Sequence, residues 1–162
     1  MDLTDGVVRL RSYQGGHADI ELAAQWYRDP EVLYYSEGPG TAPFSRERVV
    51  RMYQILSDRG ELYMIDVAVQ TEWHTVGDVT LAKDTLPIVI GAPDWRSRGI
   101  GGRVIRLLIQ RARVLGWERL TVRHVASDNV PSQRLFMQCG FELVESGVDN
   151  TGQRFHRYQL AL

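Results

Sequence analysis

A glycine-rich basic turn near the middle of the chain has the residue types needed to bind a large anion. An apolar run ends at Gly91, and the turn Arg96–Arg98 leads into Gly99–Gly102, where a long amphipathic helical pattern begins. The first amides of a helix lack internal partners and lie at the positive end of the helix dipole. Glycines let a phosphate group approach the backbone closely. These residues therefore predict a cradle for a pyrophosphate group.

Two other phosphate-binding motifs fit this segment less well. The dinucleotide-binding fingerprint Gly-x-Gly-x-x-Gly would need its third glycine at Val104, and it needs an early strand–loop–helix unit. The P-loop needs a lysine followed by Ser or Thr, and no lysine lies nearby. The pattern Gln/Arg-x-x-Gly-x-Gly does match, from Arg96 through Gly99 to Gly101. A glycine-rich turn that only caps a helix is the alternative interpretation.

A second motif follows about one β-α-β unit downstream. Asn129 precedes Pro131 and Ser132, and the helical pattern that starts there ends at Gly140-Phe141. Asparagine favours the N-cap of a helix, proline its first turn and glycine the position just after its last turn. The segment is therefore predicted to be a short, well-delimited helix.

Hydrophobic periodicity predicts the elements that must position these two motifs. Strands are predicted at residues 7–13, 62–69, 76–82, 86–90, 120–125, 141–148 and 155–162, with a hairpin connection at 71–75. Helices are predicted at residues 20–27, 31–36 and 101–115, after a cap at Ser45, and after Asn129. This order of strands and helices is typical of an α/β protein.

The two motifs, in this order and at this spacing, resemble those of the Gcn5-related N-acetyltransferase (GNAT) family. The resemblance is strong over residues 75–145, and the first sixty residues match only in layout. It implies one α/β domain over residues 1–162, with a mixed central sheet of about seven strands and helices on both faces. Strands 86–91 and 120–125 should be parallel neighbours that splay apart to form an acyl-CoA cleft.

The resemblance also implies acetyl-CoA as co-substrate and direct attack of a primary amine on it in a ternary complex. The strand before the cradle should pair with the pantetheine arm, the cradle should hold the pyrophosphate, and the second motif should line the thiol end. The cofactor contacts implied in this way are Val89, Ile90, Gly91, Arg96, Ser97, Arg98, Gly99, Ile100, Gly101, Gly102, Arg103, Asn129, Ser132 and Phe136.

Two groups are predicted to act in catalysis. A backbone amide at Ile90 would stabilise the oxyanion that forms during attack on the thioester. His124, on the strand before Asn129, is the predicted base, since imidazole titrates near ~6.5. A histidine that only packs in the strand, or a water chain with no single base, is the alternative. Four carboxylates are further candidates, although each also fits an outward-facing charge: Glu61, Asp66, Asp78 and Asp84.

The departing thiolate has no evident proton donor. Many family members have a tyrosine seven residues after the asparagine, and this chain has Phe136 there. That departure motivates an alternative, an acyl-CoA-binding module without catalysis. Cys139 lies at the end of a helix, where the dipole disfavours a thiolate, so it is predicted to be a core residue and no nucleophile. Other possible donors are Tyr13, Tyr34, Tyr35 and Tyr158.

The acceptor is expected to bind against the helices and loop of residues 30–44. A deep acidic pocket there would favour a small polyamine or an aminoglycoside, and an open groove beside the last hairpin would favour a peptide N-terminus. Asp29-Pro-Glu-Val resembles the branch with ribosomal-protein and drug-modifying acetyltransferases. Four residues could contact a cationic amine, although aromatic residues at this density more often belong to a core: Trp26, Tyr34, Tyr35 and Glu37.

Composition limits the other functions that this chain can have. Its 162 residues suffice for one domain with a core, and a net charge of −1 offers no basic field for nucleic acid or membrane. One cysteine and the absence of a signal-like N-terminus predict a cytoplasmic protein. The four histidines lack metal-ligand spacing, so no metal is expected. A homodimer is left open by the family resemblance.

Overall fold

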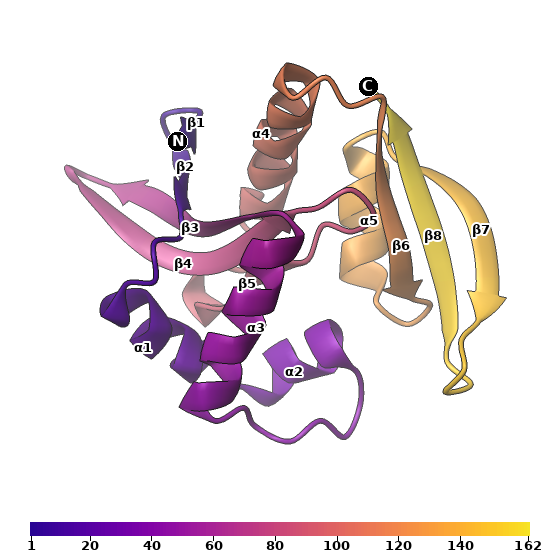
Figure 1. Cartoon of the computed structure of the whole chain (residues 1–162), viewed down its shortest axis with the longest axis horizontal. Helices are drawn as coiled ribbons and strands as arrows, with labels where there is room; N and C mark the ends of the chain where they lie inside the picture. The colour runs from indigo at the N-terminus through magenta and orange to yellow at the C-terminus, as the bar shows by residue number, and fades with distance from the viewer.

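The computed structural model describes residues 1–162 and arranges them as two antiparallel sheets with five α-helices (Figure 1). The first sheet has the order β1 (Leu3–Thr4), β2 (Val8–Ser12), β3 (Glu61–Val69), β4 (Glu72–Leu81), β5 (Ile88–Ile90). The second has the order β6 (Arg119–Ala126), β8 (Arg154–Ala161), β7 (Glu142–Val148). The helices are α1 (His17–Trp26), α2 (Pro30–Glu37), α3 (Arg46–Arg59), α4 (Ile100–Val114) and α5 (Val130–Gln138), with a short 3-10 helix η1 (Pro93–Trp95).

Three of the helices begin at side-chain caps that the sequence carries. The side chains of Asp29, Ser45 and Asn129 accept hydrogen bonds from backbone amides in the first turns of α2, α3 and α5. Each bond satisfies an amide that has no partner within its helix.

None of the helices has the length and apolar character needed to cross a lipid bilayer.

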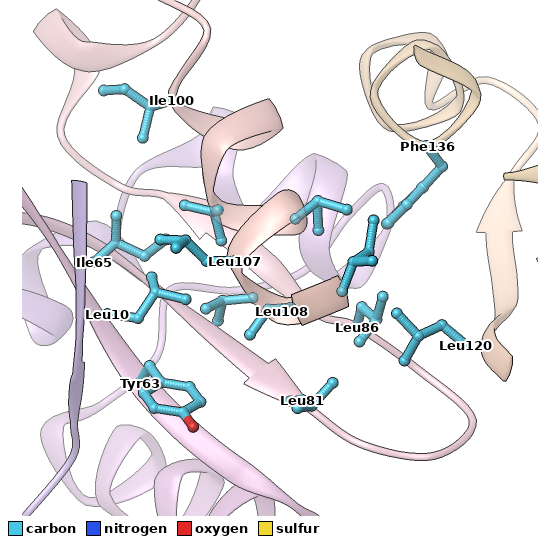
Figure 2. Packing of buried hydrophobic residues seen from close by; sticks show 14 of the residues in the cluster. Leu10, Tyr63, Ile65, Leu81, Leu86, Ile100, Leu107, Leu108, Leu120 and Phe136 are labelled. Atoms are coloured by element: carbon cyan, nitrogen blue, oxygen red, sulfur yellow. The ribbon is translucent and has the colours of Figure 1, made fainter. Parts of the chain in front are cut away.

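The five-stranded sheet carries helices on both faces because its residues alternate between two cores. Along β3, Leu62 and Met64 pack with α1, α2 and α3, whereas Tyr63 and Ile65 face the opposite side. That opposite side packs against the apolar stripe of α4 and continues into the three-stranded sheet and α5. Figure 2 shows this larger core, in which side chains from both sheets meet Leu107, Leu108 and Phe136.

Strands β5 and β6 were expected to be neighbours that splay apart within one mixed sheet. They are fully separated, and the protein has two antiparallel sheets in its place. β5 pairs only with β4, and β6 pairs only with β8. The backbone N–H of Arg123 donates to the carbonyl of Asp84 at 3.1 Å, and their side chains form an ion pair at the same distance. Pro87 lies three residues after Asp84 and has no N–H with which to continue a ladder. The two strands therefore diverge from this point.

One predicted connection is wrong. Residues 71–75 were expected to form the link between two strands, but β4 already begins at Glu72 and pairs there with Val69. The turn is confined to Gln70 and Thr71, with Gln70 in the left-handed region at φ 56°. Polar residues continue into the strand because this end of the hairpin extends past the core, where Arg9 covers the ring of Trp73 at 4.6 Å.

Candidate active site

A cleft of about 320 Å³ lies where the two sheets diverge. Its walls are residues 85–89 on one side and, on the other, Val122 and residues 124–126 of β6. Ser132 and Phe136 of α5 and residues from the C-terminal half of α2 contribute to the remaining lining. The cleft thus lies between the strand that precedes the cradle and the second sequence motif.

Backbone direction along β5 decides which peptide groups face the cleft. Thr80 N–H donates to Pro87 C=O at 3.0 Å, and Gly91 N–H donates to Val76 C=O at 2.8 Å. In an antiparallel ladder these groups alternate, so Val89, which lies opposite Asp78, also faces β4. The peptide groups of Ile88 and Ile90 therefore point away from β4. The candidate oxyanion donor, the Ile90 N–H, is on this outer edge, one residue beyond the segment 85–89 that lines the cleft.

Gly91 allows the strand to pass directly beneath an aromatic ring. A Cβ atom at this position would lie 2.1 Å from Cγ of Trp26, far inside van der Waals contact. Trp26 is only 5% exposed and belongs to the core between α1, α2 and α3. Trp26 therefore supports the end of β5 and does not line the cleft.

The predicted cradle is a run of backbone amides with no partners inside the protein. The N–H groups of residues 97–102 donate no hydrogen bond, and the first helical bond comes from Arg103 N–H to Gly99 C=O at 3.4 Å. Ser97 and Gly99 have positive φ values of 59° and 77°, which turn successive amides toward one side. The space around the missing Cβ of Gly99 is open, whereas Gly101 lies against Leu135 of α5. This geometry suits a bound anion.

The two arginines of the motif differ in their contacts. Arg96 donates to the carboxylates of Asp29 and Glu31 at 3.0 and 2.7 Å, and to the carbonyls of Ile90 and Gly91. Its guanidinium is thus occupied by protein acceptors and ties α2 to the end of β5. Arg98 forms no ion pair and lies exposed over the ring of Trp95, at 5.1 Å from its centroid. Of the two, Arg98 has the side chain free to meet a phosphate.

His124 lines the cleft from an irregular part of β6. The register with β8 shifts between Val122 and Val125, so that His124 lies in a β-bulge. Bulges turn side chains away from the regular alternation of a strand and are common beside active sites. The imidazole is 39% exposed, stacks on Phe155 with ring centroids 5.0 Å apart, and contacts Asp149 at 3.0 Å. A ligand in the cleft can therefore reach a ring whose orientation is fixed.

Two hydrogen bonds join α2 to the turn between β6 and α5. The hydroxyl of Tyr34 donates to the carboxylate of Asp128 at 2.7 Å. The side-chain amide of Asn129 donates to the carbonyl of Tyr35 at 3.3 Å, while its oxygen caps α5. Glu37 also lines the cleft, and burial raises its pKa. The lining contains these two carboxylates and no lysine or arginine.

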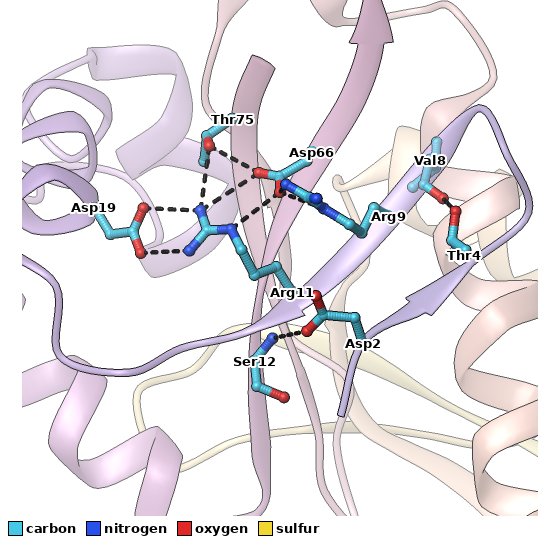
Figure 3. Close-up of polar contacts among 9 residues, drawn as sticks. All are labelled: Asp2, Thr4, Val8, Arg9, Arg11, Ser12, Asp19, Asp66 and Thr75. Atoms are coloured by element: carbon cyan, nitrogen blue, oxygen red, sulfur yellow. Dashed lines mark hydrogen bonds and ion pairs between the residues drawn. The ribbon is translucent and has the colours of Figure 1, made fainter. Parts of the chain in front are cut away.

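The four alternative carboxylates all lie outside the cleft lining. Figure 3 shows Asp66 held by Arg9, Arg11 and Thr75, with Arg11 also bound to Asp19. Glu61 binds Arg111 and the hydroxyl of Tyr63, and Asp84 binds Arg123. Asp78 is buried beneath Tyr27 and Tyr53, and this burial raises its pKa to about 6.

The remaining sequence candidates divide between cleft and core. Phe136 is 2% exposed, lines the cleft and packs edge-on against Phe141. Burial raises the pKa of the Cys139 thiol, which lies against the main core. Of the four tyrosines considered as proton donors, only Tyr34 and Tyr35 line the cleft.

Asp128 and Asp149 are the site residues that the sequence reasoning missed. Asp128 directly precedes Asn129, but only the position of α2 brings Tyr34 to it. Asp149 lies in the predicted turn of the last hairpin. Aspartate is common in turns, so its residue type there did not indicate a role in the site. Its distance from His124 depends on the register of β8 against β6, which the sequence does not show.

Comparisons with known proteins identify the family and the fold. A family model described as an acetyltransferase (GNAT) domain matches residues 8–142. The chain therefore belongs to the GNAT acetyltransferase family, which confirms the predicted fold class and family. No sequence among the curated proteins matches this chain.

Solved structures share the fold at low sequence identity. A GNAT-family acetyltransferase from Bacillus anthracis is 14% identical, with a TM-score of 0.79 and coverage of 100% of this chain and 98% of the other. Spermidine N-acetyltransferase from Vibrio cholerae, in complex with CoA and spermine, is 18% identical (TM-score 0.76; 97% and 96% covered). An acetyltransferase from Salmonella typhimurium that modifies the N-terminal serine of ribosomal protein L7/L12 is 15% identical (TM-score 0.77; 100% and 99% covered).

Proposed function

We propose that this protein is an N-acetyltransferase that uses acetyl-CoA to acetylate a small cationic primary amine. The observation that carries the proposal is the run of unpaired amides at residues 97–102, next to a cleft whose lining has the imidazole of His124, the carboxylates of Glu37 and Asp128, and no lysine or arginine. An anion-binding cradle and a pocket without positive side chains are what a pyrophosphate-bearing donor and a cationic acceptor require.

The residues present fit acetyl-CoA along the length of the site. The free amides of residues 98–102, the side chain of Arg98 and the dipole of α4 would hold the pyrophosphate, whereas Arg103 donates its amide to Gly99 and its guanidinium to Asp5. The outward-facing peptide groups of Ile88 would pair with the pantetheine amides, since those of Val89 are turned to β4 and the carbonyls of Ile90 and Gly91 accept from Arg96. Asn129, Ser132 and Phe136 would line the thiol end.

The chemistry assigned to the chain is proton transfer and charge stabilisation. When bound, acetyl-CoA supplies an activated thioester carbonyl. The Ile90 N–H would donate to the carbonyl oxygen as negative charge develops on it during attack. His124 would accept the proton that the amine nitrogen loses as the N–C bond forms and the C–S bond breaks. Solvent would protonate the departing sulfur, because Phe136 has no proton to give.

The acceptor class follows from the charge of the cleft. Glu37 and Asp128 supply negative charge, Tyr34 and Tyr35 supply aromatic surface, and both favour a cation. The hydrogen bonds from Tyr34 and Asn129 span the cleft between α2 and α5, which favours a small amine over an extended peptide. The structural neighbours include both a spermidine acetyltransferase and an acetyltransferase of a protein N-terminus, so the acceptor class is argued from the cleft alone.

Substitution of Gly99 tests the cradle, and Gly116 at the other end of α4 provides a matched control. Both glycines have nearly the same φ, 77° and 76°, and neither missing Cβ meets another atom. In Gly99→Asp the new carboxylate should compete for the free amides and repel a pyrophosphate, so CoA affinity should fall at least ~10-fold, about 1.4 kcal/mol. Gly116→Asp should bind CoA like wild type.

Calorimetric titration with CoA measures this difference in affinity, and thermal melting verifies that both variants fold.

A panel of a polyamine, an aminoglycoside, a simple monoamine and a peptide with an N-terminal serine then identifies the acceptor. A wild-type protein that does not bind CoA would refute the proposed function. Turnover of the peptide alone would refute the small-amine acceptor and retain the acetyltransferase.

A further inference from the structure

The turn between β7 and β8 brings a carboxylate to the candidate base. Oδ2 of Asp149 lies 3.0 Å from Nε2 of His124, although the two residues are 25 positions apart in the sequence. The bulge in β6 turns the ring toward this hairpin, and the stacking of Phe155 on its face restricts rotation. The contact is therefore fixed by three independent parts of the second sheet.

The other oxygen of Asp149 is already saturated. Oδ1 accepts from the N–H of Thr151 at 2.9 Å, from the Thr151 hydroxyl at 2.6 Å and from the N–H of Gln153 at 3.0 Å. The hydroxyl bond, with help from these amides and from His124, lowers the pKa of Asp149 to about 2. The carboxylate is thus ionised, immobile and able to accept at Oδ2 only.

An ionised carboxylate at Nε2 determines where the proton of a neutral imidazole lies. Because the carboxylate can only accept, Nε2 must carry the hydrogen, and Nδ1 keeps its lone pair. Nδ1 of His124 has no hydrogen-bond partner in the protein, while the ring lines the cleft. The free basic nitrogen is thus the one available to a bound acceptor.

We propose that Asp149 is a positioning residue that holds His124 as the Nε2–H tautomer and so makes Nδ1 the base that deprotonates the acceptor amine. This inference rests on the proposed function. The proton moves from the amine nitrogen to Nδ1, the imidazolium keeps its Nε2–H bond to Asp149, and the carboxylate remains ionised throughout. Such a carboxylate both orients the ring and stabilises the positive charge that it gains.

The other charged groups around His124 do not duplicate this role. Glu37 and Asp128 face the cleft from α2 and from the turn before α5, and neither contacts the imidazole. Arg123, the adjacent residue, is paired with Asp84, and Arg157 on β8 is paired with Glu145. Asp149 is the only charged group in contact with the ring.

The test is a ¹⁵N NMR measurement of the four histidine rings in wild type and in Asp149→Asn. Asparagine can keep the three bonds at its oxygen but presents an NH₂ group to Nε2, which should move the hydrogen of His124 to Nδ1. The matched control is Ser146→Ala, which removes the 2.7 Å bond between Ser146 and His156 on the same hairpin. That control should change the signals of His156 and leave His124 as the Nε2–H tautomer.

Kinetics on the acceptor found by the amine panel complete the test. In Asp149→Asn, kcat should fall ~100-fold or more, as expected when a general base is lost, while KM for acetyl-CoA stays within about twofold. The double variant with His124→Gln should be no slower than His124→Gln alone, and Ser146→Ala should retain wild-type kcat.

Two results would overturn the inference. One is a wild-type His124 with its hydrogen on Nδ1, which requires neither a variant nor a substrate to observe. The other is an Asp149→Asn enzyme whose kcat stays within about threefold of wild type. A failure of the proposed function would appear separately, as absence of turnover by wild type with every amine.

Discussion

Replacement of Asp78 by asparagine should change how the stability of this protein depends on pH. Asp78 is 2% exposed and accepts hydrogen bonds from Tyr53 at 2.7 Å and from Tyr27 at 3.0 Å. Burial raises its pKa from 3.8 to about 6, although the two hydroxyl bonds oppose the shift. The folded protein therefore holds a proton on this carboxyl more tightly than the unfolded chain does.

The sign and size of the effect follow from this shift. A carboxyl whose pKa is raised on folding contributes stability that is fully present below pH 3.8 and is lost as pH rises through about 6. A shift of about 2 units corresponds to about 3 kcal/mol. Asparagine cannot ionise, so the free energy of unfolding of Asp78→Asn relative to wild type should increase by about 3 kcal/mol across this interval.

Urea unfolding followed by tryptophan fluorescence, from about pH 3.5 to about pH 7.5, measures the difference. Asp66 and Asp149, whose pKa values are lowered, affect both proteins equally and cancel. Asp58→Asn, which changes an exposed carboxylate on α3, is the control and should show no such trend. A difference between Asp78→Asn and wild type that stays constant to within about 0.5 kcal/mol would refute the reasoning.

Two further predictions concern residues that shape the cleft. Gly91→Ala should force Trp26 away from β5 and destabilise the protein by at least about 2 kcal/mol in urea unfolding; an unchanged midpoint would contradict the close contact. Asn129→Ser should keep the cap of α5 but lose the bond to Tyr35, so stability should stay within about 0.5 kcal/mol of wild type while KM for the amine rises. Asn129→Ala should cost about 1 kcal/mol more, and equal stabilities would argue against the cap.

The sequence by itself predicted the parts of this protein that contiguous residues determine. The cradle is one example, because glycines and a helix start within a few residues suffice to leave amides unpaired. The caps at Ser45 and Asn129 are others, since each side chain binds an amide three residues away. The α/β order and the family followed from the same local patterns and from the spacing of the two motifs.

The tertiary structure alone decided which partners the charged and polar side chains have. Arg96 looked like a phosphate ligand, but α2 brings Asp29 and Glu31 to it from more than sixty residues away. His124 gained its carboxylate because a bulge and the register of β8 place the turn at Asp149 beside it. Local propensity fixes backbone shape, whereas the environment of a charge depends on long-range packing, which residue order does not display.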